Sequence, residues 1–463
     1  RYQAFLKTYP DDPKNDRVLY QLARAQEQAG DLEGALKTLT LLVSKHPGTL
    51  HAGEAQFRRG ELLFAMRQYK PAEDAYAAVL AGDDKTAFTE RALYMQGWSR
   101  FKQGRLEDGL TSFFGVLDLK LGNLSPLARE EADLAEIREL TRGDRELLDD
   151  SFRVMSISFA ALNGAEGIGR YISGPTQRTR EDYQFRVFNA LGELYIKQDR
   201  IKDAADTYAL FVRRQPLHVQ APLLQARVVE IYEKSGFDTL ALQAKKDHVE
   251  RYGVDSEFRR ANPSGWQRAQ PLVKTHLVEL ARHHHALSQK THTAADVQEA
   301  TRWYRTLLTS FPDDPQAAAN RFLLAELLYE DKRWAEAAVE YETVAYKQPG
   351  DPKAADAGYS ALLSYAALEK ETADAAKKQQ LQKDGVESAL RFAAAFPTDT
   401  RNGPVLTRAS EQLFTLGDAE RAVAVARQSL ALQPPPAPEL RRTAWTVIAH
   451  QSFEKAEYAE AEK

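Results

Sequence analysis

The chain repeats itself at a fixed interval. Residues of similar type recur every 37 positions, as at Ala23, Gly60 and Gly97. Further sets in the same register are Leu32, Tyr69 and Leu106, then Ala35, Ala72 and Gly109, then Leu39, Tyr76 and Phe113. A fixed period of this length indicates a solenoid, in which each repeat buries its apolar face only against its neighbours. The period therefore constrains the architecture strongly and the ligand very little.

The offsets within one period follow the pattern of a known family. In the first repeat, counted from Asp16, places seven, eight, twenty, twenty-four and thirty-two hold Leu22, Ala23, Ala35, Leu39 and Pro47. This order resembles the tetratricopeptide repeat, whose pattern W-x2-L-G-x2-Y is followed by A, F, A and P. The clearest copy is Phe188-x2-Leu191-Gly192-x2-Tyr195, followed by Ala204, Tyr208 and Pro216.

The resemblance covers nearly the whole chain. Other repeats begin near Gly53, Glu90, Pro222, Ala318, Gly403 and Arg442, and degenerate or lengthened ones begin near Phe152, Trp266 and Ala354. The resemblance implies an all-α fold, a right-handed superhelical solenoid of antiparallel helix pairs with no sheet.

Packing and backbone physics account for the repeated residues. A small residue at place eight of the first helix lets the second helix approach closely, so Gly60→Leu should cost about 1–3 kcal/mol through overpacking. Turn or helix-end positions are predicted at Gly30, Gly104, Gly236 and Gly417. Because proline has no N–H and disfavours helix in the residue before it, second helices should end near Pro10, Pro47, Pro216, Pro312, Pro349 and Pro397.

Composition narrows the class of partner. The chain has no cysteine, 43% hydrophobic residues and a formal net charge of −4, which predicts a globular protein without disulfides or strong polyelectrolyte character. We therefore expect no nucleic acid among its partners. No segment approaches the roughly 18 consecutive apolar residues of a membrane span. The lack of cysteine does not distinguish the cytosol from the periplasm.

The repeats are not uniform along the chain. The pattern predicts an N-terminal subarray at residues 1–120, a charged helical connector at 121–150, a middle subarray at 151–252, an interruption at 253–265 and a C-terminal subarray at 266–463. The connector mixes acidic and basic residues, which predicts a solvated helix or linker. Another irregular stretch, residues 372–383, is rich in Ala, Lys and Gln. Both chain ends fall within a repeat, so we expect a fragment of a longer protein.

Two clusters of residues suggest ligand chemistry but lack the spacing for it. His283, His284 and His285 are adjacent, and successive helical residues point about 100° apart, so the three cannot converge on one metal ion. The glycines at positions 164, 167 and 169 lack the preceding strand and the spacing of a phosphate loop, which favours a loosened helical turn. No HExxH, GxSxG or Walker motif occurs. We therefore expect no catalytic residue, no cofactor and no metal.

The first helices carry a second set of repeated residues outside the packing positions. In the family that the chain resembles, places five and nine of the first helix tend to face the concave groove. Place five holds Tyr20, Phe57, Tyr94 and Phe322, and place nine holds Arg24, Glu61, Trp98 and Glu326. We predict that these residues contact a partner, with the aromatic rings as the main contacts. The sequence leaves open the alternative that the rings only pack between neighbouring first helices.

The resemblance also implies a class of function. Some arrays of the family hold a terminal carboxylate with Lys and Asn at places five and nine, but Tyr20 and Arg24 in the first repeat, and Asn189 and Glu193 in the fifth, do not reproduce that clamp. Residues 5–12 and 57–63 resemble the bacterial envelope branch, which includes the outer-membrane barrel-assembly lipoprotein and the Tol-Pal-associated periplasmic protein. This similarity implies a non-enzymatic scaffold for a protein or peptide partner in the periplasm or cell envelope.

Two alternative functions remain at this stage. The first is a cytosolic adaptor of the same fold, which the presence or absence of a signal sequence in the full-length gene would decide. The second is the docking arm of an envelope polysaccharide enzyme whose catalytic domain lies outside this chain.

Overall fold

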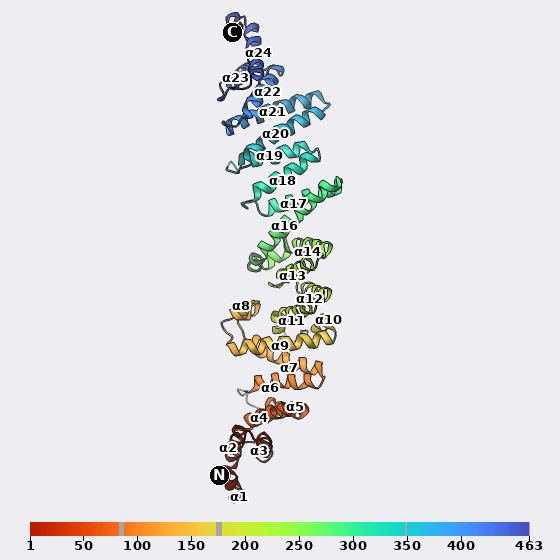
Figure 1. Ribbon diagram of the computed structural model, residues 1–463, viewed down its shortest axis with the longest axis vertical. Helices are drawn as coiled ribbons and strands as arrows, with labels where there is room; N and C mark the ends of the chain where they lie inside the picture. Colours follow the sequence, from red (N-terminus) through yellow and green to blue (C-terminus); the bar gives the residue numbers. More distant parts are fainter. Residues whose placement is uncertain (83–87, 173–177, 348–349, 463) are drawn as a thin grey trace. The chain divides into compact units, whose positions relative to one another are not determined.

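The computed structural model describes residues 1–462 apart from 83–87, 173–177 and 348–349. All regular structure in these residues is helical, and no strand occurs among them. The helices follow one another as antiparallel pairs joined by short turns (Figure 1). The predicted all-α class is therefore confirmed.

The helices begin and end as follows. In chain order they are α1 (Tyr2–Thr8), α2 (Asn15–Gln28), α3 (Leu32–Lys45), α4 (Ala52–Ala65), α5 (Tyr69–Leu80), α6 (Thr89–Lys102), α7 (Leu106–Leu121), α8 (Pro126–Glu130), the 3-10 turn η1 (Leu134–Glu136), α9 (Arg142–Ala161), α10 (Gly164–Ile172), α11 (Arg178–Lys197), α12 (Ile201–Arg214), α13 (Ala221–Lys234), α14 (Asp238–Tyr252), α15 (Glu257–Ala261), α16 (Pro263–Thr291), α17 (Ala294–Ser310), α18 (Ala317–Glu330), α19 (Trp334–Lys347), α20 (Ala354–Glu371), α21 (Ala375–Ala395), α22 (Asn402–Thr415), α23 (Ala419–Leu430), α24 (Pro438–Glu454) and α25 (Tyr458–Ala461). The first helices of successive pairs are α2, α4, α6, α9, α11, α13, α16, α18, α20, α22 and α24.

The chain forms two compact parts, residues 1–269 and 270–463. Within each part a second helix packs against its own first helix and against the first helix of the next pair, as α5 does with α4 and α6 and α19 does with α18 and α20. The division lies inside α16, shortly after the predicted interruption at 253–265. The finer boundaries of the three subarrays stay a prediction.

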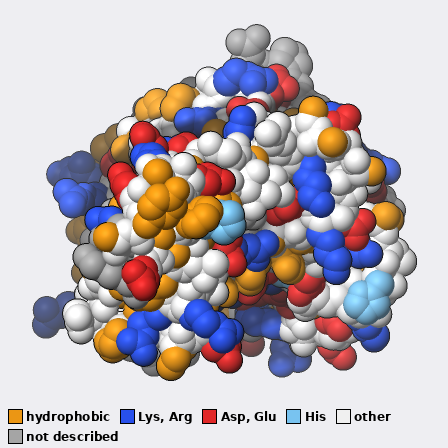
Figure 2. All heavy atoms as spheres, turned by 90° about the horizontal axis from the view of Figure 1, so that it is seen from above, with side chains coloured by type: hydrophobic (Ala, Val, Ile, Leu, Met, Phe, Trp, Pro, Cys, Tyr) orange, Lys and Arg blue, Asp and Glu red, His pale blue; other side chains and the backbone are white. Residues whose placement is uncertain are grey.

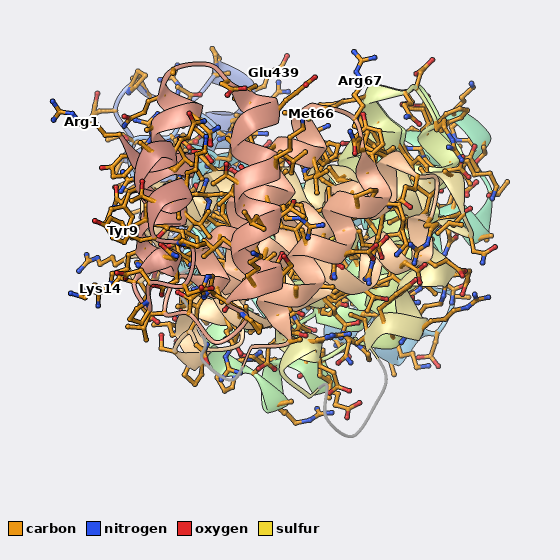
Figure 3. All side chains as sticks on the ribbon, turned by 90° about the horizontal axis from the view of Figure 1, so that it is seen from below. Arg1, Tyr9, Lys14, Met66, Arg67 and Glu439 are labelled. Atoms are coloured by element: carbon orange, nitrogen blue, oxygen red, sulfur yellow. The ribbon has the colours of Figure 1, made fainter. Side chains whose placement is uncertain are left out.

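The turn within most helix pairs contains a residue in the left-handed backbone conformation. Gly30, Gly104, Gly236 and Gly417 have φ angles of 79°, 77°, 73° and 82°, which confirms the predicted turn glycines. The equivalent position in other pairs is not glycine: Arg67, Asp199, Lys332 and Ala456 take φ angles of 60°, 57°, 60° and 61°. Figure 3 labels Arg67 at the turn between α4 and α5. Glycine is therefore favoured here because it has no Cβ, but the pair tolerates other residues.

Five of the second helices end two residues before a proline. Helices α1, α3, α12, α17 and α21 stop at Thr8, Lys45, Arg214, Ser310 and Ala395, just ahead of Pro10, Pro47, Pro216, Pro312 and Pro397. The residue between has left the helical conformation, as at His46 (φ −128°, ψ 62°) and Gln215 (φ −133°, ψ 60°). These predicted helix ends are confirmed, and Pro349 lies outside the described residues.

Close approach within a pair depends on a glycine that faces an aromatic ring. A Cβ atom added at place eight would lie 2.6 Å from the ring for Gly60 and Tyr76, 2.9 Å for Gly97 and Phe113, and 2.5 Å for Gly192 and Tyr208. Real Cβ atoms do not approach a ring so closely, and the rings are fully buried, so they have no room to move away. The predicted role of place eight in packing is confirmed.

The predicted connector differs from a single helix. Between α7 and α9 the chain forms the short helix α8 and the turn η1, and α9 begins after a capping box of Thr141 and Asp144. Ile137 and Leu140 are buried just before that box. The second half of the predicted connector is therefore the first part of a long first helix, because Leu148 already belongs to its buried face.

A buried carboxylate ties neighbouring pairs together. Glu73 on α5 accepts hydrogen bonds from Arg100 Nε (2.9 Å), Gln103 Nε2 (3.1 Å) and Arg105 Nη1 (2.7 Å). Burial alone would raise the pKa of Glu73, but the bonds from Arg100 and Gln103 and the charges of both arginines outweigh it and hold this pKa below its ordinary value. The network links α5 to α6 and to the start of α7.

The glycine–ring contact predicts a large effect of a single substitution. We expect Gly60→Leu to lower stability by about 1–3 kcal/mol, because the added side chain must displace the Tyr76 ring. Gly48→Leu is the matched control, since nothing lies within 4 Å of a Cβ atom at that position. Urea midpoints of both variants test this expectation, and equal midpoints would contradict it.

The Glu73 network predicts a pH dependence of stability. The pKa of Glu73 is lower in the folded chain than in the unfolded chain, so its contribution is present above the unfolded-state pKa of about 4.3 and is lost as the pH falls through the folded-state value. We expect Glu73→Gln to lower the urea midpoint at about pH 7 and to matter much less at about pH 3. Asp74→Asn, at an exposed neighbouring carboxylate, is the control. An effect of Glu73→Gln that is independent of pH would show this explanation to be wrong.

Candidate functional site

The first predicted contact residue lies in the packing between helix pairs. Tyr20 is only 4% exposed, and its ring stacks on His51 with centroids 4.3 Å apart and planes 2° apart. Burial raises the pKa of Tyr20, and the nearby Glu54 carboxylate raises it further. Arg24 is exposed, with its guanidinium 6.0 Å from the Tyr20 ring centroid. A partner can reach the exposed side chain of Arg24. The buried Tyr20 ring instead contributes to the packing between neighbouring helix pairs.

Phe57 and Phe322 occupy equivalent packing positions. The Phe57 ring is 4% exposed and lies 5.9 Å from the Tyr76 ring and 5.2 Å from the Phe88 ring. The Phe322 ring is 7% exposed and meets the Tyr341 ring edge-on at 5.5 Å. Their placement agrees with the alternative that these place-five rings pack between neighbouring helices.

Tyr94 and Trp98 meet on a carboxylate that the repeat pattern did not single out. The Tyr94 hydroxyl donates to Asp150 Oδ2 at 2.6 Å, and Trp98 Nε1 donates to the same oxygen at 3.1 Å. Arg153 pairs with the other carboxylate oxygen of Asp150. Burial alone would raise the pKa of Asp150, but these partners hold it below its ordinary value. Asp150 lies on α9, which replaces the expected fourth 37-residue copy, so periodicity could not identify it.

Two of the glutamates at place nine form hydrogen bonds within their own helix pairs. Glu61 Oε1 accepts the Tyr76 hydroxyl at 2.6 Å, and Glu193 Oε1 accepts the Tyr208 hydroxyl at 3.1 Å. Burial raises the pKa of the half-buried Glu326, which occupies the same place farther along the chain. In the second and fifth repeats, a glutamate at place nine therefore accepts the hydroxyl of the tyrosine at place twenty-four.

A large cavity in the N-terminal part lies across three first helices. It has a volume of about 650 Å³ and is bounded by α9, α11, α13 and residues 132–135. Its apolar lining is Phe152, Phe185, Ala190, Leu194, Leu223 and Leu224. We call this cavity the groove. A pocket with an apolar floor and polar groups around it is the usual form of a binding site.

Charged side chains surround the apolar floor. Glu193 accepts hydrogen bonds from Arg227 Nε (3.2 Å) and Nη2 (2.8 Å), while Lys197 is exposed at the same end of α11. At the other end of the groove, burial raises the pKa of Asp149, and the charge of Asp133 raises it further. The groove therefore presents both signs of charge, with exposed Lys197 available to an acidic group.

The register of the helices explains why these side chains share one cavity. Helices α9, α11 and α13 are all first helices, so they run in the same direction and bring equivalent turns side by side. Asn189 and Glu193 occupy places five and nine of their repeat and both line the groove. The expectation that places five and nine face the partner is therefore consistent with the groove in the fifth repeat. Neither Asn189 nor Glu193 was among the predicted contacts.

A second, smaller cavity occurs in the C-terminal part. It has a volume of about 170 Å³ and lies among α20, α21 and α22, where Leu362, Leu381, Ala389 and Val405 contribute most of its apolar wall. Its lining also includes polar side chains, among them Glu369, Arg408 and Gln412.

The histidine and glycine clusters have structural positions. His284 and His285 are buried on α16, where His285 Nδ1 lies 3.1 Å from the Tyr304 hydroxyl, and His283 faces outward. No group of three His, Asp or Glu side chains in the described ranges could hold a metal ion. The glycines from Gly164 onward begin and continue α10, and Gly164 has a φ angle of 58°.

Two further surface properties concern partners. In the described part of the chain, no helix combines the length and apolar character that a membrane crossing requires. Acidic and basic side chains are interspersed over the face shown in Figure 2. That face therefore carries no extended region of positive charge of the kind that nucleic-acid binding needs.

Two segments match known sequence families. Residues 17–49, which include most of α2 and all of α3, and residues 293–355, which include α17, α18 and α19, match models described as tetratricopeptide repeat. Both segments therefore match the tetratricopeptide repeat (TPR). The matched segments come from both compact parts.

The chain also matches solved structures, with low identity. The C-terminal part of a TPR repeat-containing protein from Cytophaga hutchinsonii matches at 12% identity and a TM-score of 0.26, over 65% of this chain and 98% of that one. Yeast Tom70 matches at 15% identity and a TM-score of 0.24, over 98% of this chain and 91% of that one. No curated protein matches the chain.

The burial of the place-five rings predicts that their removal lowers the stability of the folded chain. We expect Phe57→Ala to destabilise the N-terminal part by about 3–5 kcal/mol, because it leaves a cavity beside Tyr76 and Phe88. Leu50→Ala is the matched control, since Leu50 is 94% exposed. Melting temperatures distinguish the two roles of the ring: a Phe57→Ala protein that melts like the control would remove Phe57 from the core.

Proposed function

We propose that this chain is a non-enzymatic TPR scaffold that holds a segment of a protein or peptide partner in the groove of α9, α11 and α13. The observation that carries the proposal is the groove itself, about 650 Å³ with an apolar floor and a charged rim. A bound segment would place apolar side chains against Leu194 and Leu223 and direct polar groups to the rim. TPRs in general mediate contacts between proteins, which supports this use of the groove.

The predicted contacts in the N-terminal pairs enter the proposal in two groups. Arg24, Tyr94 and Trp98 keep part of their surface open, so we propose that they extend the binding surface along the first helices. The buried rings of Tyr20 and Phe57 act indirectly, because they hold those helices at the correct spacing. Phe322 and Glu326 are proposed to do the same within the C-terminal part.

We further propose that the partner belongs to a bacterial cell-envelope assembly and that the full-length protein works in the periplasm. The support is the resemblance of residues 5–12 and 57–63 to envelope members of the family. Fractionation of the host that makes the full-length protein tests this proposal separately. Recovery of the protein with the cytosol would contradict the periplasmic location and leave the groove proposal standing.

Two substitutions in the groove test the scaffold function. We expect Lys197→Glu and Leu223→Ala each to weaken the captured partner at least about tenfold, because one reverses a rim charge and the other removes apolar contact. Lys37→Glu on α3 is the matched control, at an exposed lysine outside the groove. The partner is captured in the host by cross-linking to the full-length protein, and affinities are then measured by calorimetry. Unchanged affinity of both folded groove variants would refute the proposed site.

A further inference from the structure

One wall of the groove is a segment outside the helix pairs. Residues 125–136, which we call the strap, comprise α8, η1 and the residues between them. Helix α8 packs beside α11 (Figure 1). The backbone is extended at Glu131 (φ −68°, ψ 130°) and at Asp133 (φ −87°, ψ 117°). An extended acidic segment therefore already lies on the face that α11 and α13 present to the groove.

The first helices hold the strap by its main chain. Gln220 Nε2, at the start of α13, donates to the carbonyl oxygen of Glu130 at 2.7 Å. Arg186 on α11 donates from Nη1 to the carbonyl oxygen of Ala132 at 2.9 Å and from Nη2 to that of Glu131. Because these contacts use carbonyl groups, which every residue carries, another extended segment could make them equally well.

Polar contacts rather than burial keep the strap in place. None of its residues is buried, and the nearest buried positions are Leu124 before it and Ile137 after it. An ion pair between Arg129 Nη1 and Asp182 Oδ2 at 2.8 Å adds to the carbonyl contacts. A hydrogen bond of this kind to a charged group contributes about 1.5–3 kcal/mol net. The strap can therefore leave the groove, with both of its ends and the helix pairs still folded, once another segment takes over these contacts.

Arg186 determines which kind of segment can replace the strap. Its side chain is 5% exposed, its guanidinium lies 4.8 Å from the Phe185 ring centroid, and no described carboxylate forms an ion pair with it. Burial lowers the pKa of Arg186 to about 10, so the group stays charged at neutral pH. A buried charge that loses its acceptors is strongly destabilising. Any segment that displaces the strap must therefore bring oxygen acceptors to this guanidinium.

We propose that the strap is an internal ligand of the groove, and that the partner presents an extended acidic segment that replaces it on Arg186 and Gln220. The inference rests on the proposed function and names the chemistry of the partner. The template for that chemistry is the strap itself, which places Glu130, Glu131 and Asp133 around the small residue Ala132. A further acidic group of the partner would lie near Lys197.

Because the strap is covalently attached to the chain at both ends, it competes strongly with a free segment for the groove. A segment attached at both ends has an effective concentration on the order of millimolar at its own site. A free segment of equal intrinsic affinity must exceed that concentration before it replaces the strap. Binding in trans should therefore be far tighter once the strap's own residues are removed.

Replacement of the strap gives the direct test. In the variant, residues 128–135 of the full chain become a glycine–serine segment of equal length, and the probe is a fluorescein-labelled peptide with the sequence of residues 126–137. Fluorescence anisotropy should show that the variant binds this peptide at least about tenfold more tightly than the unmodified chain does. A peptide of the same length in which Gln and Asn replace the acidic residues should bind the variant much more weakly. A helical variant that does not bind the acidic peptide, or that binds the neutral peptide equally well, would overturn the proposal.

Two further measurements extend the test, and the second does not depend on the folding of the strap-replaced variant. In the strap-replaced chain, Gln220→Ala should weaken peptide binding severalfold, whereas Gln243→Ala, which removes an exposed hydrogen bond on α14, should not. In the unmodified chain, an excess of the peptide should speed amide hydrogen exchange in residues 128–136. Unchanged exchange at peptide concentrations in the millimolar range would count against displacement of the strap.

The outcomes also separate this inference from the scaffold function. If the peptide fails to bind while Lys197→Glu still abolishes partner capture, the strap is not a ligand mimic and the proposed function stands. If the peptide binds at the groove while neither groove variant affects partner capture, the internal ligand is supported and the partner's site lies elsewhere.

Discussion

The contact between a small residue on the first helix and a ring on the second sets the spacing of the helices within a pair. Gly60 and Gly192 have no side chain, so Tyr76 and Tyr208 lie directly on the first helix. From there the tyrosine hydroxyls reach the glutamates one position later, at 2.6 Å and 3.1 Å. The same contact thus fixes both the spacing within a pair and its internal hydrogen bond.

The groove is a consequence of that spacing. When each pair is held at a fixed thickness, successive first helices lie in parallel, and residues at equivalent places form rows across them. In most of the N-terminal part the rows are filled by rings such as Phe57 or joined to a carboxylate such as Asp150. Across α9, α11 and α13 the row leaves a cavity of about 650 Å³, and the strap occupies its edge.

Periodicity predicted the features that depend on local chemistry. The turn glycines, the prolines that end second helices and the small residues at place eight were all found, because backbone conformation and close approach select a residue type at a fixed offset. The left-handed turn at Arg67 could not be predicted, since the residue type gives no signal for that conformation. The place-five rings left two interpretations open because an aromatic residue suits both a core and a binding surface.

The groove and the strap depend on contacts that no period encodes. Gln220 and Glu130 are 90 residues apart, and Arg186 lies 55 residues from Glu131. Both contacts involve carbonyl oxygens, which leave no trace in the sequence. Arginine is a residue type that is common on protein surfaces, so the sequence does not single out Arg186. Only its burial beside Phe185 shows that its guanidinium requires an acceptor.

A site-specific photo-cross-linker gives the most direct test of the claim that α9, α11 and α13 hold the partner. Asn189 is exposed and lines the groove, so p-benzoylphenylalanine in its place should cross-link the partner in the host. The same group at Lys37, outside the groove, should not. Cross-linking from position 37 but not from position 189 would contradict the account.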